Sequence, residues 1–315
     1  MKAMVLAAGL GTRMAPLARS CAKPALPVLD VPVILGLVRQ LAAGGVERAI
    51  VNAHAHPESL RAALRDAPIP IDWLLEPEPR GSGGGILGAR GLLEGGAPFL
   101  VVNGDMSLEL DVAAFAAEHR KRGAMVTLAL RDDERKREFG SIGYDRDGHV
   151  CRITERIDLG GEKASGLFIG VQVMSAGIFA RMPARAAFEI IPDVFVPILR
   201  AGEKIATWLQ PSRAAWAPVG TPGELLEANL AALCGVQVDP TARVQGEVAG
   251  PAWIGARARI AAGARVGPHA VVSADAEVGA GAVLSRALAL PGARVAAGAS
   301  LAGAIAYGEE VWRDG

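Results

Sequence analysis

The chain has 315 residues, of which 51% are hydrophobic and 21% are charged, so a folded globular protein is expected and bulk disorder is not. Its 33 basic residues balance 33 acidic ones, which gives no sign of a nucleic-acid-binding or membrane-surface protein. No stretch reaches the roughly 18 apolar residues that a transmembrane helix needs. Three scattered cysteines without a CxxC pair argue against a disulfide framework or a zinc site. We therefore expect a cytoplasmic protein that acts on small molecules.

The first 234 residues alternate short apolar runs with amphipathic segments, which is typical of a mostly parallel sheet covered by helices. Strands are predicted at residues 2–7, 48–52, 70–75, 99–103 and 125–130. Helices are predicted at 31–43, 58–64, 84–93 and 112–121, and a strand-rich insertion at 140–175. This pattern predicts a Rossmann-like three-layer α/β domain over residues 1–234.

After Cys234 the pattern changes to apolar residues at a strict spacing of six. They are Ile254, Ile260, Val266, Val272, Val278, Leu284 and Leu290. This period excludes a packed helix and matches the hexapeptide β-helix, in which three hexads make one triangular coil. We predict a short left-handed parallel β-helix over residues 235–315 that joins copies of the chain into a homo-oligomer. Its few coils and single histidine, His269, argue against an acyltransferase site.

A glycine-rich loop follows the first predicted strand and contains Gly9 and Gly11. Glycines at this place let backbone N–H groups approach a phosphate, and Arg13 and Lys23 add positive charge. The loop is not a Rossmann fingerprint, because the third glycine of GxGxxG falls on Met14. It is not a Walker A loop either, because no GK[ST] follows.

The longer string LAAGLGTRMAPL, followed by KPALPV, resembles the signature of the sugar-1-phosphate nucleotidyltransferases. Further matches are NGD at 103–105, GSGGGI at 81–86, FG at 139–140 and WAPVGTP at 216–222. The GGGI variant is similar to that of muramate-phosphate uridylyltransferases, and mannose-1-phosphate guanylyltransferases are the other close group. The resemblance implies transfer of a nucleoside monophosphate from an NTP to a sugar 1-phosphate. Uridylyl and guanylyl transfer both stay open, as do muramic acid, mannose and heptose phosphates as acceptors.

The resemblance also implies a role for each matching residue. Arg13 would hold the β- and γ-phosphates, Lys23 the α-phosphate and the sugar phosphate, and Asp105 the Mg²⁺ ion. The implied nucleotide-binding residues are Ala7, Ala8, Gly9, Gly11, Thr12, Arg13, Glu76, Gly81, Gly83 and Gly84. The implied sugar-binding residues are Asn103, Gly140, Glu155 and Gly170. No general base is required, because a sugar phosphate oxygen is already ionised at neutral pH, and alignment and charge neutralisation are the main demands.

Two departures from the family pattern affect these assignments. Pro218 stands where relatives carry a second metal-binding aspartate, and proline offers no side-chain donor atom. Asp105 with substrate oxygens would then suffice, Glu224 would substitute, or the chain would be a nucleotide-sugar-binding regulator without turnover. In the sugar site Arg156 replaces the lysine after Glu155, and Glu162 is the alternative remnant of that motif. The five histidines show no metal-ligand spacing and are interpreted as ordinary surface or helix residues.

Overall fold

Contacts between residues divide the chain into two units in a computed structural model that describes residues 1–313. The last two residues of the predicted 235–315 domain lie outside this range. One unit, here called the sheet unit, contains Met1–Leu10 and Ile34–Trp216. The other, here called the β-helix unit, contains Gly11–Val33 and the chain from Ala217 onward. The segment with Arg13 and Lys23 is therefore part of the β-helix unit.

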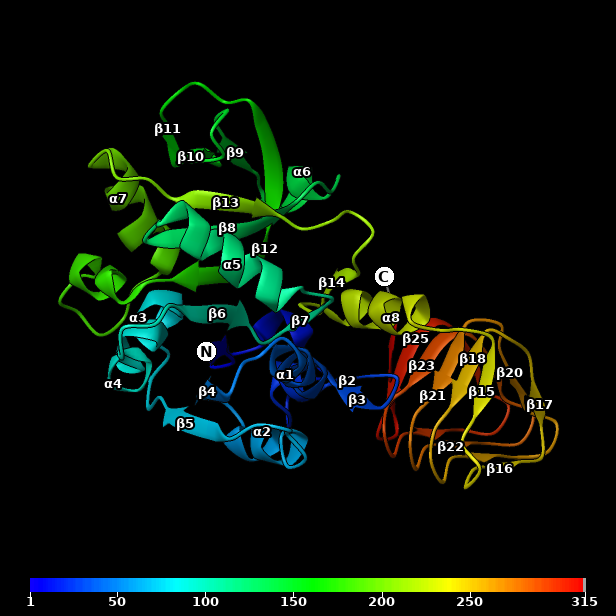
Figure 1. Ribbon diagram of the computed structural model, residues 1–315. Coiled ribbons are helices and arrows are strands. Elements are labelled where there is room, and N and C mark those ends of the chain that lie inside the picture. Colours follow the sequence, from blue (N-terminus) through cyan, green and yellow to red (C-terminus); the bar gives the residue numbers. More distant parts are fainter. Residues whose placement is uncertain (314–315) are drawn as a thin grey trace. The chain divides into compact units, whose positions relative to one another are not determined.

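The sheet unit is built on a mixed sheet with strand order β11-β10-β9-β12-β6-β1-β4-β5, in which β8 pairs with β12 and β13 with β8 (Figure 1). The strands are β1 (Lys2–Leu6), β4 (Arg48–Ala53), β5 (Ile71–Leu75), β6 (Phe99–Asn103), β8 (Val126–Arg131), β9 (Ile142–Tyr144), β10 (Val150–Ile153), β11 (Ile157–Asp158), β12 (Ala164–Met174) and β13 (Ala206–Leu209). A short strand β7 (Met106–Leu108) follows β6. Strands β1, β4, β5 and β6 are parallel, so their carboxyl ends meet at one edge. At that edge Leu6 is the register partner of both Asn52 and Asn103.

Helices connect these strands and pack on the sheet. They are α1 (Val33–Ala43), α2 (Pro57–Ala63), α3 (Gly81–Gly88), α4 (Arg90–Leu93), α5 (Val112–Arg122), α6 (Lys136–Phe139), η3 (Ala176–Arg181), η4 (Ile191–Phe195) and α7 (Val196–Arg200). Helix α5 contacts β8, β12 and β13, whereas α3 and α4 contact β1. The first turn of α5 is capped by Asp111, whose carboxylate accepts a hydrogen bond from the backbone N–H of Ala114. Gly123, with a φ of +58°, ends this helix.

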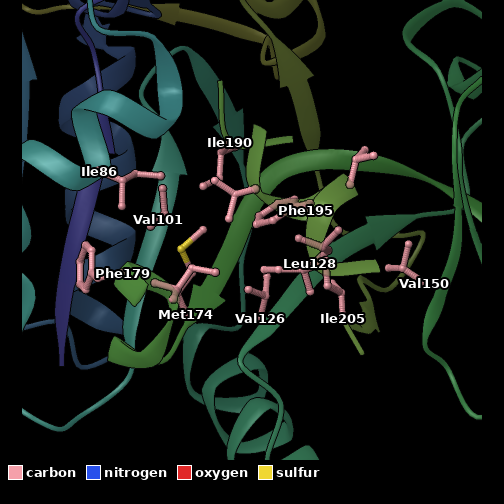
Figure 2. Packing of buried hydrophobic residues seen from close by; sticks show 14 of the residues in the cluster. Ile86, Val101, Val126, Leu128, Val150, Met174, Phe179, Ile190, Phe195 and Ile205 are labelled. Atoms are coloured by element: carbon pink, nitrogen blue, oxygen red, sulfur yellow. The ribbon is translucent and has the colours of Figure 1, made fainter. Parts of the chain in front are cut away.

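The core of the sheet unit is made by strands that are buried on both faces. Phe99, Leu100, Val101 and Val102 of β6 are all at most 1% exposed, which explains why this strand is a continuous apolar run. Figure 2 shows Val101 with Ile86 of α3, Val126 and Leu128 of β8 and Phe195 of η4 in one cluster. The predicted α/β architecture is thus confirmed.

The β-helix unit contains a parallel β-helix. Its strands are β15 (Val236–Val238), β16 (Arg243–Val244), β17 (Glu247–Val248), β18 (Ala252–Ile254), β19 (Arg259–Ile260), β20 (Arg265–Val266), β21 (Ala270–Val272), β22 (Glu277–Val278), β23 (Val283–Ala289), β24 (Arg294–Val295), β25 (Ser300–Tyr307) and β26 (Glu310–Arg313). Ala252 pairs in parallel with Ala270, 18 residues later, which is one coil of three hexads. The next partner of Ala270 is Ala287, which makes a coil of 17 residues. This shorter coil explains why the apolar residues after Leu290, Val295 and Leu301, are one residue out of phase with the spacing of six.

All seven apolar residues of the hexad pattern are buried, with exposed fractions between 0 and 6%. The prediction of a β-helix is therefore confirmed by both the register and the burial. Among residues 1–313, no helix is both long and apolar enough to cross a membrane.

The segment Gly11–Val33 packs with α8 and the β-helix in one hydrophobic cluster. Its elements, and those that lead into the β-helix, are η1 (Thr12–Met14), η2 (Lys23–Ala25), β2 (Pro27–Val28), β3 (Val31–Pro32), β14 (Trp216–Pro218) and α8 (Pro222–Ala231). Strands β2 and β3 form an antiparallel hairpin. The helix predicted from residue 31 therefore begins two residues later, because residues 31–32 pair with β2 instead.

Candidate active site

A buried polar network lies at the carboxyl ends of β1, β4 and β5. The backbone N–H of Ala7 donates to Oδ1 of Asn52 over 2.7 Å, and Nδ2 of Asn52 donates to Oε1 of Glu76 over 2.8 Å. The other Glu76 oxygen, Oε2, accepts from the backbone N–H of Arg80 at 3.1 Å. Asn52 and Glu76 are only 2% and 4% exposed. The structure thus joins two predicted nucleotide-binding residues, Ala7 and Glu76, through an asparagine that the sequence analysis did not select.

Helix α3 carries three predicted nucleotide-binding residues, Gly81, Gly83 and Gly84. The backbone N–H groups of Gly83 and Gly84 both donate to the carbonyl oxygen of Phe188, at 3.0 and 3.1 Å. A Cβ atom on Gly83 would overlap the Phe188 ring, and one on Gly84 would overlap the carbonyl oxygen of Ala186. Close packing therefore requires glycine at both positions. Their contact with a nucleotide base, and that of Gly81 at the start of the helix, stays a prediction.

Asp105 lies in the turn between β6 and β7. The backbone N–H of the preceding Gly104 donates to the carbonyl oxygen of Leu6 over 2.8 Å. A Cβ atom on Gly104 would lie 3.5 Å from Cβ of Ala7, so this turn is held against the end of β1. Asp105, the predicted metal ligand, therefore lies at the same edge of the sheet as Ala7. Ala7 is the start of the predicted phosphate loop, which continues with Ala8 and Gly9.

Two of the predicted sugar-binding residues are in contact. Gly170 has a φ of +75°, and a Cβ atom there would lie 2.8 Å from Nδ2 of Asn103. On the strand residue before it, the carbonyl oxygen of Ile169 accepts from the indole N–H of Trp216 over 3.4 Å. The Trp216 ring also meets the ring of Phe139 edge to face, with 6.4 Å between the centroids. The aromatic pair of Trp216 and Phe139 thus adjoins the contact between Asn103 and Gly170.

The other two predicted sugar residues belong to the insertion. Gly140 has a φ of +89°, and a Cβ atom there would lie 2.7 Å from Cγ2 of Thr154, the neighbour of the exposed Glu155. The alternative residue, Glu162, accepts from Nε of Arg152 over 2.6 Å, and Arg152 also donates to Oγ of Ser141. Glu162 is thereby part of an ion pair that fixes the insertion.

In the β-helix unit, Arg13 lies on η1 beside the amino-terminal end of α8. A Cβ atom on Gly220 would lie 3.4 Å from Nη2 of Arg13. The backbone N–H of Gly220 donates to Oε2 of Glu224 over 2.7 Å, and the N–H of Glu224 donates to Oγ1 of Thr221. Thr221 therefore caps α8, and Glu224, one candidate replacement for the missing metal ligand, already accepts a hydrogen bond from the residue before that cap through Oε2. Pro218 is buried in the strand β14 just before this turn.

His119 is a helix residue, which the sequence-based interpretation includes, and it is buried. His119 is 2% exposed on α5, with Nδ1 at 2.8 Å from Oγ1 of Thr127 and Nε2 at 3.1 Å from Oγ of Ser175. Its burial, with the charge of Arg120, lowers the pKa of His119 to about 4, so it is neither a surface residue nor charged at neutral pH.

His149 departs from the interpretation that no histidine has metal-ligand spacing. One of its ring nitrogens and carboxylate oxygens of Asp145 and Asp147 all lie within 4.8 Å of one another. This group occupies the turn between β9 and β10, where Asp145 accepts from the backbone N–H groups of Asp147 and His149 at 2.9 Å each. Turn formation explains the group without a metal ion, and none of the three is a predicted site residue.

Comparison with known proteins identifies the family. The family model described as nucleotidyl transferase matches residues 2–234. The chain belongs to this family. That range contains every predicted site residue, from Ala7 to Gly170.

Curated relatives carry the name mannose-1-phosphate guanylyltransferase or a variant of it. The protein of that name from Mycobacterium tuberculosis is 29% identical over 76% of this chain and 67% of its own length. The mannose-1-phosphate guanylyltransferase catalytic subunit beta from Xenopus tropicalis is 27% identical over 72% of this chain and 63% of its own length. The chain thus spans about two thirds of the length of these curated relatives.

A solved structure has the same fold. HddC from Yersinia pseudotuberculosis, complexed with GMP-PN, aligns with a TM-score of 0.60 and 25% identity. The alignment covers 72% of this chain and 97% of that protein.

Proposed function

We propose that this chain transfers a nucleoside monophosphate from an NTP to a sugar 1-phosphate, which yields an NDP-sugar and pyrophosphate. The observation that carries the proposal is the family match over residues 2–234, which includes all the predicted site residues. The relatives' names make GTP and mannose 1-phosphate the first substrates to test. The complex of the structural neighbour HddC with GMP-PN supports nucleotide binding by this chain.

The proposed reaction is a displacement at the α-phosphorus. An oxygen of the sugar phosphate forms the new P–O bond, the bond to the β-phosphate breaks, and pyrophosphate leaves with the electron pair. Arg13 holds the β- and γ-phosphates and neutralises the charge that builds up on the leaving group. Lys23 holds the α-phosphate and the incoming sugar phosphate in line. Asn103, Gly140, Glu155 and Gly170 bind the sugar.

Enzymes of this family generally use a divalent metal ion, and we infer Mg²⁺ here. Asp105 would hold it, because a carboxylate in the turn after β6 is the hard oxygen donor that Mg²⁺ prefers. When bound, the ion supplies charge neutralisation to the triphosphate oxygens. Because Mg²⁺ usually keeps waters and substrate phosphates as ligands, one carboxylate is a sufficient protein contribution despite Pro218.

A nucleotide-sugar-binding regulator without turnover is the alternative that Pro218 motivates, and the names of the curated relatives, which are those of enzymes, do not favour it. Pyrophosphate release should be measured with a panel of NTPs and sugar 1-phosphates in the presence of Mg²⁺. Turnover with one pair is the expected result. Absence of turnover with every pair, together with measurable NDP-sugar binding, would establish the regulator instead.

The residues 235–315 serve, in this proposal, as an oligomerisation domain that follows a nucleotidyltransferase domain at 1–234. The first coil exposes apolar side chains that a longer helix would bury, since Val238 and Val244 are 45% and 38% exposed. At the other end, β26 pairs antiparallel with β25. Val238→Asp should therefore lower the mass of the protein in solution, as measured by light scattering. An unchanged mass would contradict the proposal. We also infer a cytoplasmic location, because three scattered cysteines without a CxxC pair fit a reducing compartment.

A further inference from the structure

We infer that Asp30 and Asn229 are positioning residues for Arg13 and Lys23, and that the β-helix thereby supports the two cations that are proposed to bind the nucleotide phosphates. This inference rests on the proposed function, because it assigns a purpose to the contacts of the segment that carries the two cations. The relevant contacts all lie within the β-helix unit.

The turn of the β2–β3 hairpin is held by the β-helix itself. Oδ2 of Asp30 accepts from the indole N–H of Trp253 over 2.8 Å, and Oδ1 accepts from the backbone N–H of Ala274 over 3.0 Å. Trp253 lies on β18, whereas Ala274 follows β21, so one carboxylate ties the hairpin to two successive coils. A charged acceptor with two donors is among the stronger hydrogen-bond arrangements.

The same turn is held from the other side by α8. Asn229, which is 1% exposed, accepts from the backbone N–H of Leu29 over 2.9 Å and donates to the carbonyl oxygens of Pro27 and Leu225. Leu29 and Asp30 both have positive φ, 46° and 65°, a region that leucine rarely adopts and aspartate tolerates. The side chains of Asn229 and Asp30 hold the turn in this conformation from both sides.

Short backbone links lead from the hairpin to Lys23. The backbone N–H of Val33 donates to the carbonyl oxygen of Leu26 over 3.0 Å. The backbone N–H of Leu26 in turn donates to the carbonyl oxygen of Lys23 over 3.1 Å. Leu26 is 5% exposed and packs in the cluster that also contains Val271 of β21. A shift of the hairpin would therefore move the backbone of Lys23.

Arg13 is anchored to the same cluster. The next residue, Met14, is fully buried there with Leu225 of α8 and Leu288 of β23. Each of the two proposed phosphate-binding cations is thus close in sequence to an apolar side chain that packs against the β-helix. Since displacement chemistry depends on alignment, even a small shift of these cations should reduce the rate strongly.

The test compares Asp30→Ala and Trp253→Phe with the wild-type chain. Trp253→Phe keeps an aromatic ring but removes the N–H donor together with part of the indole. Both variants should lower kcat/KM for the NTP about ten- to a hundredfold, with a smaller effect of Asp30→Asn, which keeps one acceptor oxygen. The matched control is Glu247→Ala, which removes an exposed carboxylate on the β-helix that pairs with Arg265 and should leave kcat/KM unchanged.

Two further measurements make each outcome decisive. The Kd for GTP, UTP or dTTP gives a readout without turnover, and urea unfolding midpoints measure stability. Variants that lose stability but keep kcat, KM and Kd would show that the contacts only stabilise the fold and would overturn the inference. A wild-type chain that binds nucleotide without turnover refutes the proposed enzyme, and Kd then decides the inference. Failure of the wild-type chain to bind any nucleotide refutes both.

Discussion

Replacing Asn52 with leucine would test whether the buried network at the edge of the sheet holds the start of the phosphate loop. Leucine has a similar size but offers neither the acceptor for the N–H of Ala7 nor the donor for Glu76. A buried N–H without a partner costs about 1–3 kcal/mol, and a hydrogen bond to a charged group contributes about 1.5–3 kcal/mol. Leucine recovers part of this by burying apolar area, so the free energy of unfolding should fall by about 2–4 kcal/mol.

Urea unfolding of the full chain, followed by circular dichroism, would measure this loss, and isothermal titration would measure the expected weakening of NTP binding. Gln172→Leu on β12 is the matched control. Gln172 is 3% exposed in the same sheet, but among the described residues its Oε1 accepts no hydrogen bond. Leucine should therefore cost less than about 1 kcal/mol there. A loss below about 1 kcal/mol for Asn52→Leu, with unchanged NTP affinity, would refute the reasoning.

Two further predictions concern the metal site and the pH dependence of stability. Asp105→Asn should reduce kcat about a hundred- to a thousandfold in a pyrophosphate-release assay, because it removes the proposed Mg²⁺ ligand. The control is Asp72→Asn, which changes a surface pair with Arg48 and should leave kcat unchanged. A wild-type rate for Asp105→Asn would exclude Asp105 as the metal ligand. His119 has a pKa of about 4 when folded and about 6.5 when unfolded, so the unfolded chain binds the proton more readily and stability should fall by up to about 3 kcal/mol as the pH drops from about 6.5 to 4. His119→Gln should flatten that part of the urea-midpoint curve, and an equally steep curve for this variant would contradict the prediction.

Much of the fold follows from local patterns in the sequence. The β-helix is predictable because each coil must bury the same hexad position, which repeats as visible apolar residues from Ile254 to Leu290. The parallel strands are predictable because burial on both faces gives continuous apolar runs such as residues 99–102. Helix α3 is different, since it begins at Gly81, where glycines disfavour a helix. Packing against residues 186–188 stabilises it, and that contact is absent from the local sequence.

The candidate site was less predictable, because its supports depend on pairing between distant parts of the chain. Asn52 meets Glu76 only because β4 and β5 are neighbours in a particular register. Asp30 accepts a hydrogen bond from Ala274, 244 residues away, and no periodicity in the sequence signals this contact. Glycine and charge patterns therefore predict which residues bind phosphate, but not which residues hold them in place.

Pro218 gives the positioning of Arg13 and Lys23 a greater weight in the proposed reaction. With only Asp105 as a carboxylate ligand, the protein contributes less to a metal site, and more of the charge on the triphosphate must be neutralised by the two cations. Those cations belong to a segment that packs with α8 and the β-helix in one hydrophobic cluster. If Asp105 is the single carboxylate ligand, as proposed, the reaction would depend more strongly on Asp30, Asn229 and the coils that hold the two cations.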